Sequence, residues 1–412
     1  DRSDGGLITT LLEMAFSGNC GIEVELSGQG SVLEVLFSEE LGYVLECQQD
    51  DVTQIMQLMN SVDVPVLNIG RSVAESRISI TYNDELVLAE SMPELRQVWE
   101  ETSYQLERLQ TAPDCADEER ETIFKRTGPA YNLSFQPETT PEKILCKDDK
   151  PKVAILRDEG SNSDREMTAA FYAAGFEPWD ICMTDLLSGR VTLDRFRGIA
   201  AVGGFSYADV PESAKGWAAT ILFNDMLKSQ FDTFYSRTDT FTFGICNGCQ
   251  LFGLIGWVPW SGIKPEHQPR FVKNSSARFE SRWITAKVNK SPAVMLKGME
   301  NLSFGIHVDH GEGRLYFPDQ RIKERVLKEN LTPLVYVDDA GNQTERYPFN
   351  PNGSPAGLAG LCSPDGRHLA LMPHPERTFL TWQAHWLPED MKQLPVSPWM
   401  RMFQNAYEWC TA

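Results

Sequence analysis

Hydrophobic and polar positions alternate in a regular way from Lys152 onward. KVAILRDEG is an apolar run that ends at a Gly turn, and SNSDREMTAAFYAAGF after it has the spacing of an amphipathic helix capped by Ser or Asp. GIAAVGG and DTFTFGIC are two further apolar runs typical of buried strands, and KGWAATILFNDMLKSQF between them predicts one helix. Buried strands that alternate with helices predict a mostly parallel sheet with helices on both faces.

The N-terminal quarter of the chain has a different pattern. LLEMAFSGNCGIEVELSG indicates a helix end, a Gly-rich turn and a strand, which is typical of part of an α+β unit. Apolar residues recur among charges in MPELRQVWEETSYQLERLQ, and this spacing predicts one amphipathic helix at a domain edge. Residues 111–150 are rich in Pro and charge and have weak periodicity, as linkers do. We therefore expect a domain at 1–110, a linker at 111–150 and a domain at 151–412.

The composition limits the classes of protein to which the chain can belong. A length of 412 residues with 42% hydrophobic content favours two or three folded domains. A formal net charge of −20 repels polyanions, so we expect no nucleic-acid partner. No apolar run approaches the roughly 18 residues that a membrane span needs, so we expect no membrane insertion.

Cysteine usage and the first residue bear on the compartment and on the extent of the chain. The nine cysteines are an odd number without paired metal-ligand spacing, which favours a reducing compartment, and we predict a cytoplasmic location. The chain begins at Asp1 with DRSDGGLITTLLEMAF, which has the pattern of the interior of a packed unit and no basic leader. We therefore expect a fragment or a processed chain.

The segment FTFGICNGCQLFG predicts a sharp turn from a strand into a helix, with Cys246 at the turn. Gly244 and Gly248 leave little bulk beside it, and the N-terminus of the following helix offers N–H groups and a positive potential that favours the thiolate. We predict that Cys246 is a nucleophile. Cys249, three residues later, is predicted to be an ordinary helix residue that faces the core.

A nucleophilic thiol needs a general base, and the base needs a third group to orient it. HLALMPHPERTF places His374 just after an apolar strand, with Glu376 two residues later, so both side chains can point the same way from extended backbone. The predicted triad is therefore Cys246, His374 and Glu376. His368, beside charged residues, is predicted to lie at the surface.

Acyl transfer also needs N–H donors for an oxyanion. In AVGGFSYADV, Gly203 and Gly204 end a buried strand, so the N–H of Gly204 or of Phe205 is a candidate donor. A plain strand-to-loop turn is the alternative interpretation of the same segment.

With the turn and the base described, the motif G-x-C-x-G-x-Q is complete in Gly244, Cys246, Gly248 and Gln250. The chain thus resembles the class I glutamine amidotransferases, which carry a His-Pro-Glu segment like the one found here. The resemblance implies a flavodoxin-like glutaminase domain in which Gln250 helps to hold the substrate glutamine.

Longer segments carry a narrower resemblance. RDEGSNSDREM, GGFSYADV, HVDHGEGRLYF, YPFNPNGSPAGLAGLC and SPWMRMFQNA are similar to the C-terminal glutaminase of the large single-chain formylglycinamide ribonucleotide amidotransferases, from residue 152 to the end. DRSDGGLITTLLEMAFSGNCGIEVEL resembles the end of the second aminoimidazole-ribonucleotide-synthetase-like repeat of that family.

This family resemblance implies an ATP-dependent carbon-nitrogen ligase of de novo purine biosynthesis. Its glutaminase releases ammonia, and its synthetase uses ATP and Mg²⁺ to convert formylglycinamide ribonucleotide to formylglycinamidine ribonucleotide. The implied partners are glutamine, ATP and formylglycinamide ribonucleotide. The glutaminase domain itself needs no cofactor, and the complete reaction needs an N-terminal synthetase portion that this chain lacks.

The remaining candidates have equally plain alternatives. His310 and Glu312 in HGEG suit a loop over the active site that contacts glutamine or the ammonia path, or else a surface loop. Asp1 and Asp4 in DRSDGGL are candidates for a nucleotide or metal site, or else an ordinary turn, and no metal ligand is assigned with certainty.

Two rival functions stay open on the sequence alone. One is a cysteine hydrolase or peptidase on the same fold, against which Gln250 and the His-Pro-Glu segment argue. The other is a non-catalytic scaffold or ammonia-channel module, against which the intact triad argues.

Overall fold

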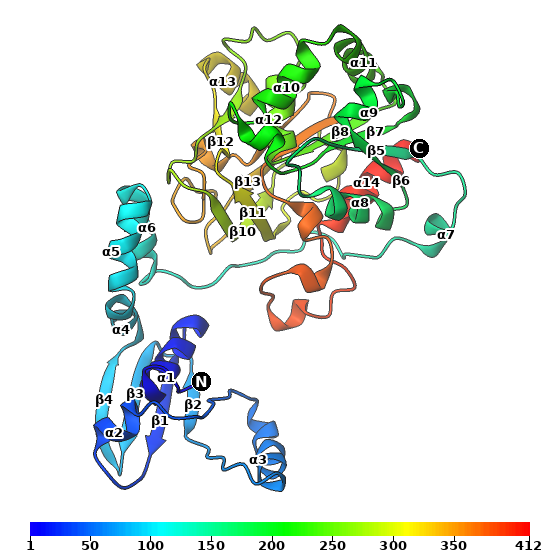
Figure 1. Cartoon of the computed structure of the whole chain (residues 1–412). Helices are drawn as coiled ribbons and strands as arrows, with labels where there is room; N and C mark the ends of the chain where they lie inside the picture. The colour runs from blue at the N-terminus through cyan, green and yellow to red at the C-terminus, as the bar shows by residue number, and fades with distance from the viewer. The chain divides into compact units, whose positions relative to one another are not determined.

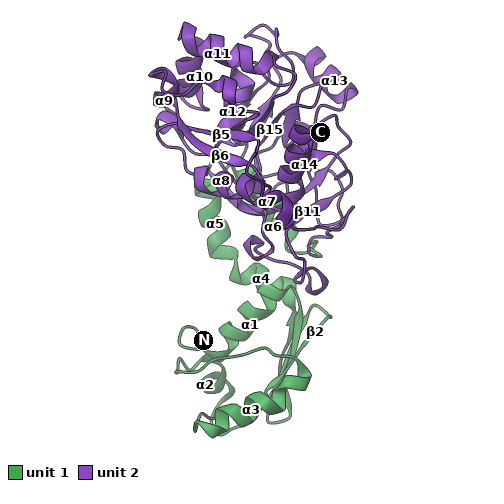
Figure 2. Cartoon of the chain, turned by 90° about the vertical axis from the view of Figure 1, so that its right-hand side faces the viewer, with its two compact units in different colours: residues 1–127 green, residues 128–412 purple.

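A computed structural model describes residues 1–412, which form two compact units, Asp1–Thr127 and Gly128–Ala412. Figure 2 colours these units separately. No helix combines the length and the apolar character that a bilayer span requires.

The first unit is a four-stranded sheet with helices, as the α+β prediction requires. Its strands, in the sheet order β2-β1-β3-β4, are β1 (Gly21–Leu26), β2 (Gly70–Val73), β3 (Arg77–Tyr82) and β4 (Glu85–Ser91). Only β1 and β3 pair in parallel. Its first helices are α1 (Gly6–Gly18), α2 (Val32–Phe37) and α3 (Val52–Ser61). Leu7 and Leu11 of α1 share one buried cluster with Ile78 and Ile80 of β3, so α1 covers the sheet.

The single helix predicted over residues 92–110 is wrong in one respect, because the chain turns at Glu100. It forms α4 (Met92–Trp99) and α5 (Glu101–Gln110). Within the predicted linker lies a further helix, α6 (Pro113–Thr122), which packs against α5: the Tyr104 hydroxyl donates to Asp117 at 2.6 Å. The sequence PDCADEERET has too few apolar positions to show a helical period, so this helix could not be predicted from hydrophobic patterning.

The second unit is built on a six-stranded sheet in the order β14-β15-β8-β7-β5-β6. Its strands are β5 (Lys152–Arg157), β6 (Glu177–Cys182), β7 (Gly198–Ala201), β8 (Phe241–Ile245), β14 (Gly360–Cys362) and β15 (His368–Leu371). All neighbours are parallel except β14 and β15. Without β14, the parallel strands follow the flavodoxin-like order of second, first, third, fourth and fifth. The predicted fold class is confirmed.

Helices cover both faces of this sheet, as Figure 1 shows. On one face lie α9 (Met183–Leu187), α10 (Lys215–Leu222), α11 (Asp225–Ser236) and α12 (Asn247–Leu254), and on the other α8 (Asp164–Ala173) and α14 (Met400–Thr411). Every residue of β8 is buried, which accounts for a sequence that is apolar apart from Thr242.

The one helix predicted over KGWAATILFNDMLKSQF is in fact two, α10 and α11. The Asn224 side chain accepts a hydrogen bond from the Leu227 N–H at 3.0 Å and so caps a new helix. Asn is a common helix N-cap, but here it lies within a run of regularly spaced apolar residues, so the spacing alone predicted one continuous helix.

A second, antiparallel sheet adds to the parallel one. It consists of β10 (Glu280–Val288), β11 (Ser303–His310) and β13 (Leu334–Tyr336), and a separate two-stranded ribbon pairs β9 (Arg270–Val272) with β12 (Arg314–Tyr316). Two further helices of this unit are α13 (Gln320–Lys328) and α7 (Glu142–Leu145), and α7 lies away from the antiparallel sheet (Figure 1). The hydrophobic pattern of the sequence did not predict this sheet. It matters for function because β11 ends beside Cys246.

The prediction that His368 lies at the surface is wrong. The side chain is buried, its Nδ1 lies 3.0 Å from the Thr242 hydroxyl, and its ring stacks on Tyr235 with centroids 4.2 Å apart. Burial lowers the pKa of His368 to about 3, and the charge of Arg367 acts in the same direction. The folded chain therefore holds this imidazole neutral.

We predict that His368 makes the second unit less stable in acid. Its folded-state pKa lies below the unfolded value of 6.5, so stability is complete above pH 6.5 and is lost as the pH falls. By pH 5 this group should cost about 2 kcal/mol. His368→Gln cannot titrate, so the fall in unfolding free energy between pH 8 and pH 5 should shrink by that amount. Urea unfolding followed by tryptophan fluorescence measures it, since nine of the ten tryptophans lie in this unit. An unchanged difference would contradict the assignment.

Candidate active site

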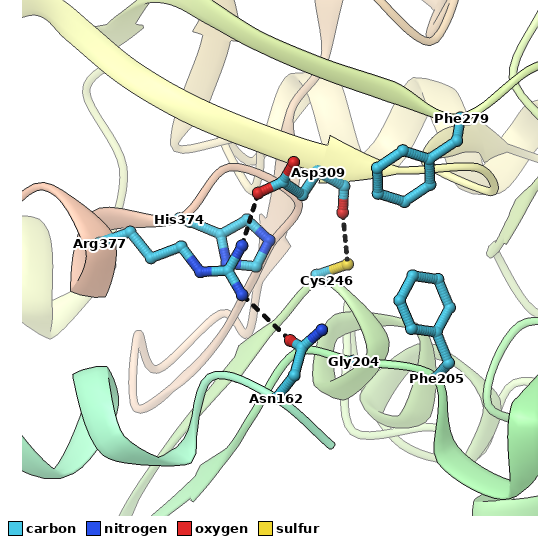
Figure 3. A pocket seen from close by; sticks show the side chains of 8 residues that line it. All are labelled: Asn162, Gly204, Phe205, Cys246, Phe279, Asp309, His374 and Arg377. Atoms are coloured by element: carbon cyan, nitrogen blue, oxygen red, sulfur yellow. Dashed lines mark hydrogen bonds and ion pairs between the residues drawn. The ribbon is translucent and has the colours of Figure 1, made fainter. Parts of the chain in front are cut away.

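Three neighbouring parallel strands end at one edge of the sheet, and each carries a predicted site residue just beyond its end. Gly204 follows β7, Cys246 follows β8 and His374 follows β15. The registers Ala201–Gly244 and Leu371–Ile245 hold these ends side by side. Figure 3 shows the residues around the resulting pocket. The carboxyl edge of a parallel sheet is where such folds bind ligands.

Cys246 occupies a strained backbone conformation between β8 and α12. Its φ of 51° and ψ of −105° are rare for a residue with a side chain, and its N–H donates to the Leu371 carbonyl at 2.9 Å. A Cβ on Gly248 would lie 2.0 Å from the Ala201 oxygen, and one on Gly244 would lie 2.5 Å from the Gly248 oxygen. Both motif glycines are therefore required by the close approach of backbone segments at this turn.

His374 and Glu376 form a buried pair. The His374 Nδ1 lies 2.6 Å from a Glu376 carboxylate oxygen, and the His374 Nε2 has no hydrogen-bond partner. The His374 N–H donates to the His307 carbonyl at 2.8 Å, which fixes the backbone. A Cβ on Gly203 would lie 2.8 Å from the His374 imidazole and 3.4 Å from the Cys246 Cβ, so the imidazole and the Cys246 side chain border the same glycine. The pair thus has the arrangement of an oriented base beside a thiol.

The resting thiol is neutral. Burial raises the pKa of Cys246 to about 12, although the positive charge of Arg377 and a hydrogen bond from the Asn247 N–H lower it. The sulfur donates to the Asp309 carbonyl at 3.2 Å. The helix N-terminus therefore does not make Cys246 a thiolate by itself, and nucleophilic attack requires that a base take the proton.

Of the two candidate oxyanion donors, only one N–H is free. The Phe205 N–H donates to the Gly160 carbonyl at 2.8 Å, whereas the Gly204 N–H donates no hydrogen bond. The φ of Gly204 is +136°, and a Cβ there would lie 2.5 Å from the Gly160 oxygen. The Asn247 N–H hydrogen-bonds to the Cys246 sulfur and Gly204 lines the pocket with Cys246, so these two N–H groups are the candidate oxyanion donors.

Gln250 and Glu312 lie behind the pocket and do not line it. The buried Gln250 side chain donates to the Glu312 carbonyl at 2.9 Å and accepts from the Asn247 side chain at 2.8 Å. The Glu312 carboxylate accepts from the N–H and the hydroxyl of Ser213, each at 2.6 Å. These two residues tie the HGEG loop and the loop before α10 to the helix that follows Cys246.

His310 and the two N-terminal aspartates also lie outside the pocket. The His310 side chain is buried against Asn352, and burial lowers its pKa to about 4. Asp1 and Asp4 are exposed in the other unit, where the Asp1 carboxylate accepts hydrogen bonds from Ser3. No group of three or more His, Cys, Asp or Glu side chains in the chain is arranged to hold a metal ion.

The pocket contains more residues than the sequence suggested. Its lining is Asn162, Gly204, Phe205, Cys246, Phe279, Asp309, His374 and Arg377. Four of these, Asn162, Phe279, Asp309 and Arg377, were not predicted. Arg377 directly follows the His-Pro-Glu segment, so its place in the sequence could have indicated it. Asp309 and Phe279 are brought to the pocket by the antiparallel sheet, which was not predicted.

Comparison with known proteins agrees with this geometry. The family described as a CobB/CobQ-like glutamine amidotransferase domain matches residues 150–410. The C-terminal domain of proteins related to AIR synthase matches residues 1–83.

Curated relatives match the whole chain. The chain is 53% identical to a probable chloroplastic/mitochondrial phosphoribosylformylglycinamidine synthase of Arabidopsis thaliana, over 99% of this chain and 30% of the relative. It is 48% identical to phosphoribosylformylglycinamidine synthase of Dictyostelium discoideum, over 100% of this chain and 32% of the relative, and 46% identical to that of Homo sapiens, over 99% and 32%. The chain thus spans about a third of the length of these relatives.

We predict that Cys246 alkylates slowly and without a plateau at moderate pH. Because its pKa is about 12 rather than 9.0, its thiolate fraction should rise about tenfold per pH unit from pH 7 to pH 10. Iodoacetamide labelling read by peptide mass spectrometry measures this rate, with exposed Cys146 as the reference in the same chain. A plateau at or below pH 9 would mean that the resting thiol is acidic.

Proposed function

The chain belongs to the CobB/CobQ-like glutamine amidotransferase domain family, and on that premise we propose that residues 151–412 hydrolyse glutamine and release ammonia. Cys246 is the nucleophile, His374 the general base and Glu376 the group that orients it. One observation carries the proposal: the buried His374–Glu376 pair, with its Nε2 unpartnered, borders the same glycine as the Cys246 side chain.

The first half of the reaction forms a thioester. The His374 Nε2 takes the thiol proton, and the sulfur attacks the carboxamide carbon of glutamine. The N–H groups of Gly204 and Asn247 stabilise the oxyanion. The imidazolium then gives its proton to the departing nitrogen as the carbon–nitrogen bond breaks, which leaves ammonia and a γ-glutamyl thioester on Cys246.

The second half returns the enzyme to its resting state. His374 takes a proton from water, the hydroxide attacks the thioester, and glutamate leaves as Cys246 regains its proton. Glu376 stabilises the imidazolium in both halves by accepting its Nδ1–H. In this proposal Gln250, His310 and Glu312 hold the loops of the glutamine site without contacting the reacting atoms, and Phe205 forms a wall of the pocket.

In the longer protein, we propose that this ammonia is used by a phosphoribosylformylglycinamidine synthase reaction, as the names of the relatives suggest. Formylglycinamide ribonucleotide and ATP are the other substrates, and the synthetase portion that accounts for most of the relatives' length carries out the ligation. Residues 1–110 are the end of that synthetase, and 111–150 connect it to the glutaminase.

ATP and Mg²⁺ are proposed for the complete enzyme alone. Asp1 and Asp4 offer two carboxylates and no third ligand nearby, so they do not form a metal site by themselves. Any role for them depends on ligands from outside this chain. We retain the cytoplasm as the proposed location, although the Arabidopsis relative is named for organelles.

The proposal is tested by labelling with 6-diazo-5-oxo-L-norleucine, a glutamine analogue that alkylates the nucleophile and needs no synthetase. We expect modification of Cys246 only, blocked by glutamine and abolished in Cys246→Ala. Cys249→Ala, which alters a buried neighbour on α12, is the matched control and should label normally. Modification elsewhere, or none in a folded chain, would refute the assignment of the nucleophile. Turnover of a peptide but not of glutamine would favour the cysteine hydrolase.

Glu376→Gln tests the orienting role. The amide keeps the size of the side chain but loses the charge that stabilises the imidazolium, so labelling by the analogue should slow by roughly 10²- to 10⁴-fold. The rate is measured by mass spectrometry over time in chains shown to be folded by circular dichroism. A rate equal to that of the parent would mean that Glu376 is structural.

A further inference from the structure

Arg377 is the one cation that lines the pocket, and the proposed mechanism does not use it. It follows the His374–Glu376 pair on the short helical turn Pro375–Arg377, and its side chain is about one-fifth exposed. Figure 3 shows its guanidinium group reaching into the pocket between Asp309 and Asn162. Burying most of a charged side chain costs free energy, so we ask what the guanidinium group of Arg377 does beside Cys246.

The guanidinium group is held on two sides. Its Nη1 donates to the Asp309 carboxylate at 2.5 Å, and its Nη2 donates to the Asn162 carboxamide oxygen at 3.0 Å. Asp309 is itself paired with the Nε2 of His307 at 2.6 Å. Burial alone would raise the pKa of Asp309, but hydrogen bonds from His307 and Ser281 hold it well below its usual range, so the carboxylate stays charged. The position of Arg377 is therefore fixed before any ligand binds.

These contacts leave donors unused. A guanidinium group has five N–H bonds, and Asp309 and Asn162 take one each. The Nε of Arg377 is buried without a hydrogen-bond partner, 3.8 Å from a Glu166 carboxylate oxygen, so the N–H bonds left for a ligand are those of the two terminal nitrogens. A planar group with free N–H bonds and a fixed position suits a carboxylate.

The rest of the pocket suits the remainder of an amino acid. Phe205 and Phe279 face each other with ring centroids 5.9 Å apart, and both are partly exposed. Both rings form an apolar wall that Figure 3 shows on the other side of Cys246 from Arg377. An amino acid whose side-chain carboxamide lies at Cys246 also brings an α-carboxylate into the pocket, and Arg377 is the one cation among the lining residues.

We infer that Arg377 binds the α-carboxylate of the substrate, which makes the pocket specific for free glutamine over glutamine in peptide or amide linkage. This inference rests on the proposed glutaminase function. Asp309 and Asn162 act as positioning residues that hold the guanidinium, and Arg377 is a specificity-determining residue.

Arg377 has one other possible role, because its charge also favours the thiolate of Cys246. The two roles differ in what they require of the reagent. An effect on the thiolate changes the rate with any electrophile, whereas carboxylate binding changes it only with a reagent that carries the α-carboxylate.

The test compares two alkylating reagents at Cys246 in the full chain. 6-Diazo-5-oxo-L-norleucine carries the amino-acid head group of glutamine, and iodoacetamide does not. In Arg377→Gln, the second-order labelling rate with the first reagent should fall by about 10- to 100-fold, since hydrogen bonds to a charged group are lost. The rate with iodoacetamide should change by less than about threefold, because the exposed part of the charge is screened.

Arg401→Gln is the matched control, since Arg401 pairs with Glu408 on α14 and does not line the pocket. It should leave both rates unchanged. If Arg377→Gln fails to fold, Arg377→Lys provides the same comparison with a smaller loss. Equal falls with both reagents, or no fall with either, would overturn the inference and leave the glutaminase proposal intact. Absence of analogue labelling at Cys246 in the parent chain would refute the glutaminase proposal itself.

Discussion

The active-site geometry depends on the close approach of α12 to β7. A Cβ on Gly248 would lie 2.0 Å from the Ala201 oxygen, and the Gly248 N–H donates to the Val202 carbonyl at 3.1 Å. This contact sets the sharp turn that holds Cys246 at a positive φ. The N–H groups of Asn247 and Gly204 follow the neighbouring strands β8 and β7, and both lie near the thiol: Asn247 hydrogen-bonds to it and Gly204 lines the same pocket. A larger residue at Gly248 would push α12 away from β7 and so move Cys246 away from the proposed oxyanion donor Gly204.

Burial has two opposite effects on the reactivity of Cys246. It raises the pKa of Cys246 to about 12, so that almost no thiolate exists at neutral pH. The same exclusion of water strengthens the hydrogen bond between His374 and Glu376. A buried thiol with so high a pKa reacts slowly unless a base takes its proton, which is the role proposed for His374. A low thiolate fraction also makes Cys246 slow to be oxidised and slow to react with unrelated electrophiles.

The parts of the fold that could be predicted are those with a regular period. The parallel strands are buried on both faces, so their apolar runs predicted the sheet and therefore placed Cys246 and His374 at one edge. The break between helices at Asn224 could not be predicted, because a capping residue leaves the hydrophobic period unchanged. The helix Pro113–Thr122 could not be predicted either, because its acidic sequence has no hydrophobic period. His368 was placed at the surface because the charged residues beside it in sequence concealed its burial against Tyr235.

The antiparallel sheet shows why the full pocket could not be read from motifs. Asp309 lies on β11, opposite Ser281 of β10, and this pairing presents its two polar parts in different directions. Its carbonyl accepts the Cys246 thiol, and its carboxylate holds Arg377. No single segment contains this arrangement, since β10 and β11 must first pair and then pack beside the parallel sheet. A motif search finds groups that are close in sequence, such as His374 and Glu376. The residues that surround the substrate come from strands that only the tertiary fold brings together.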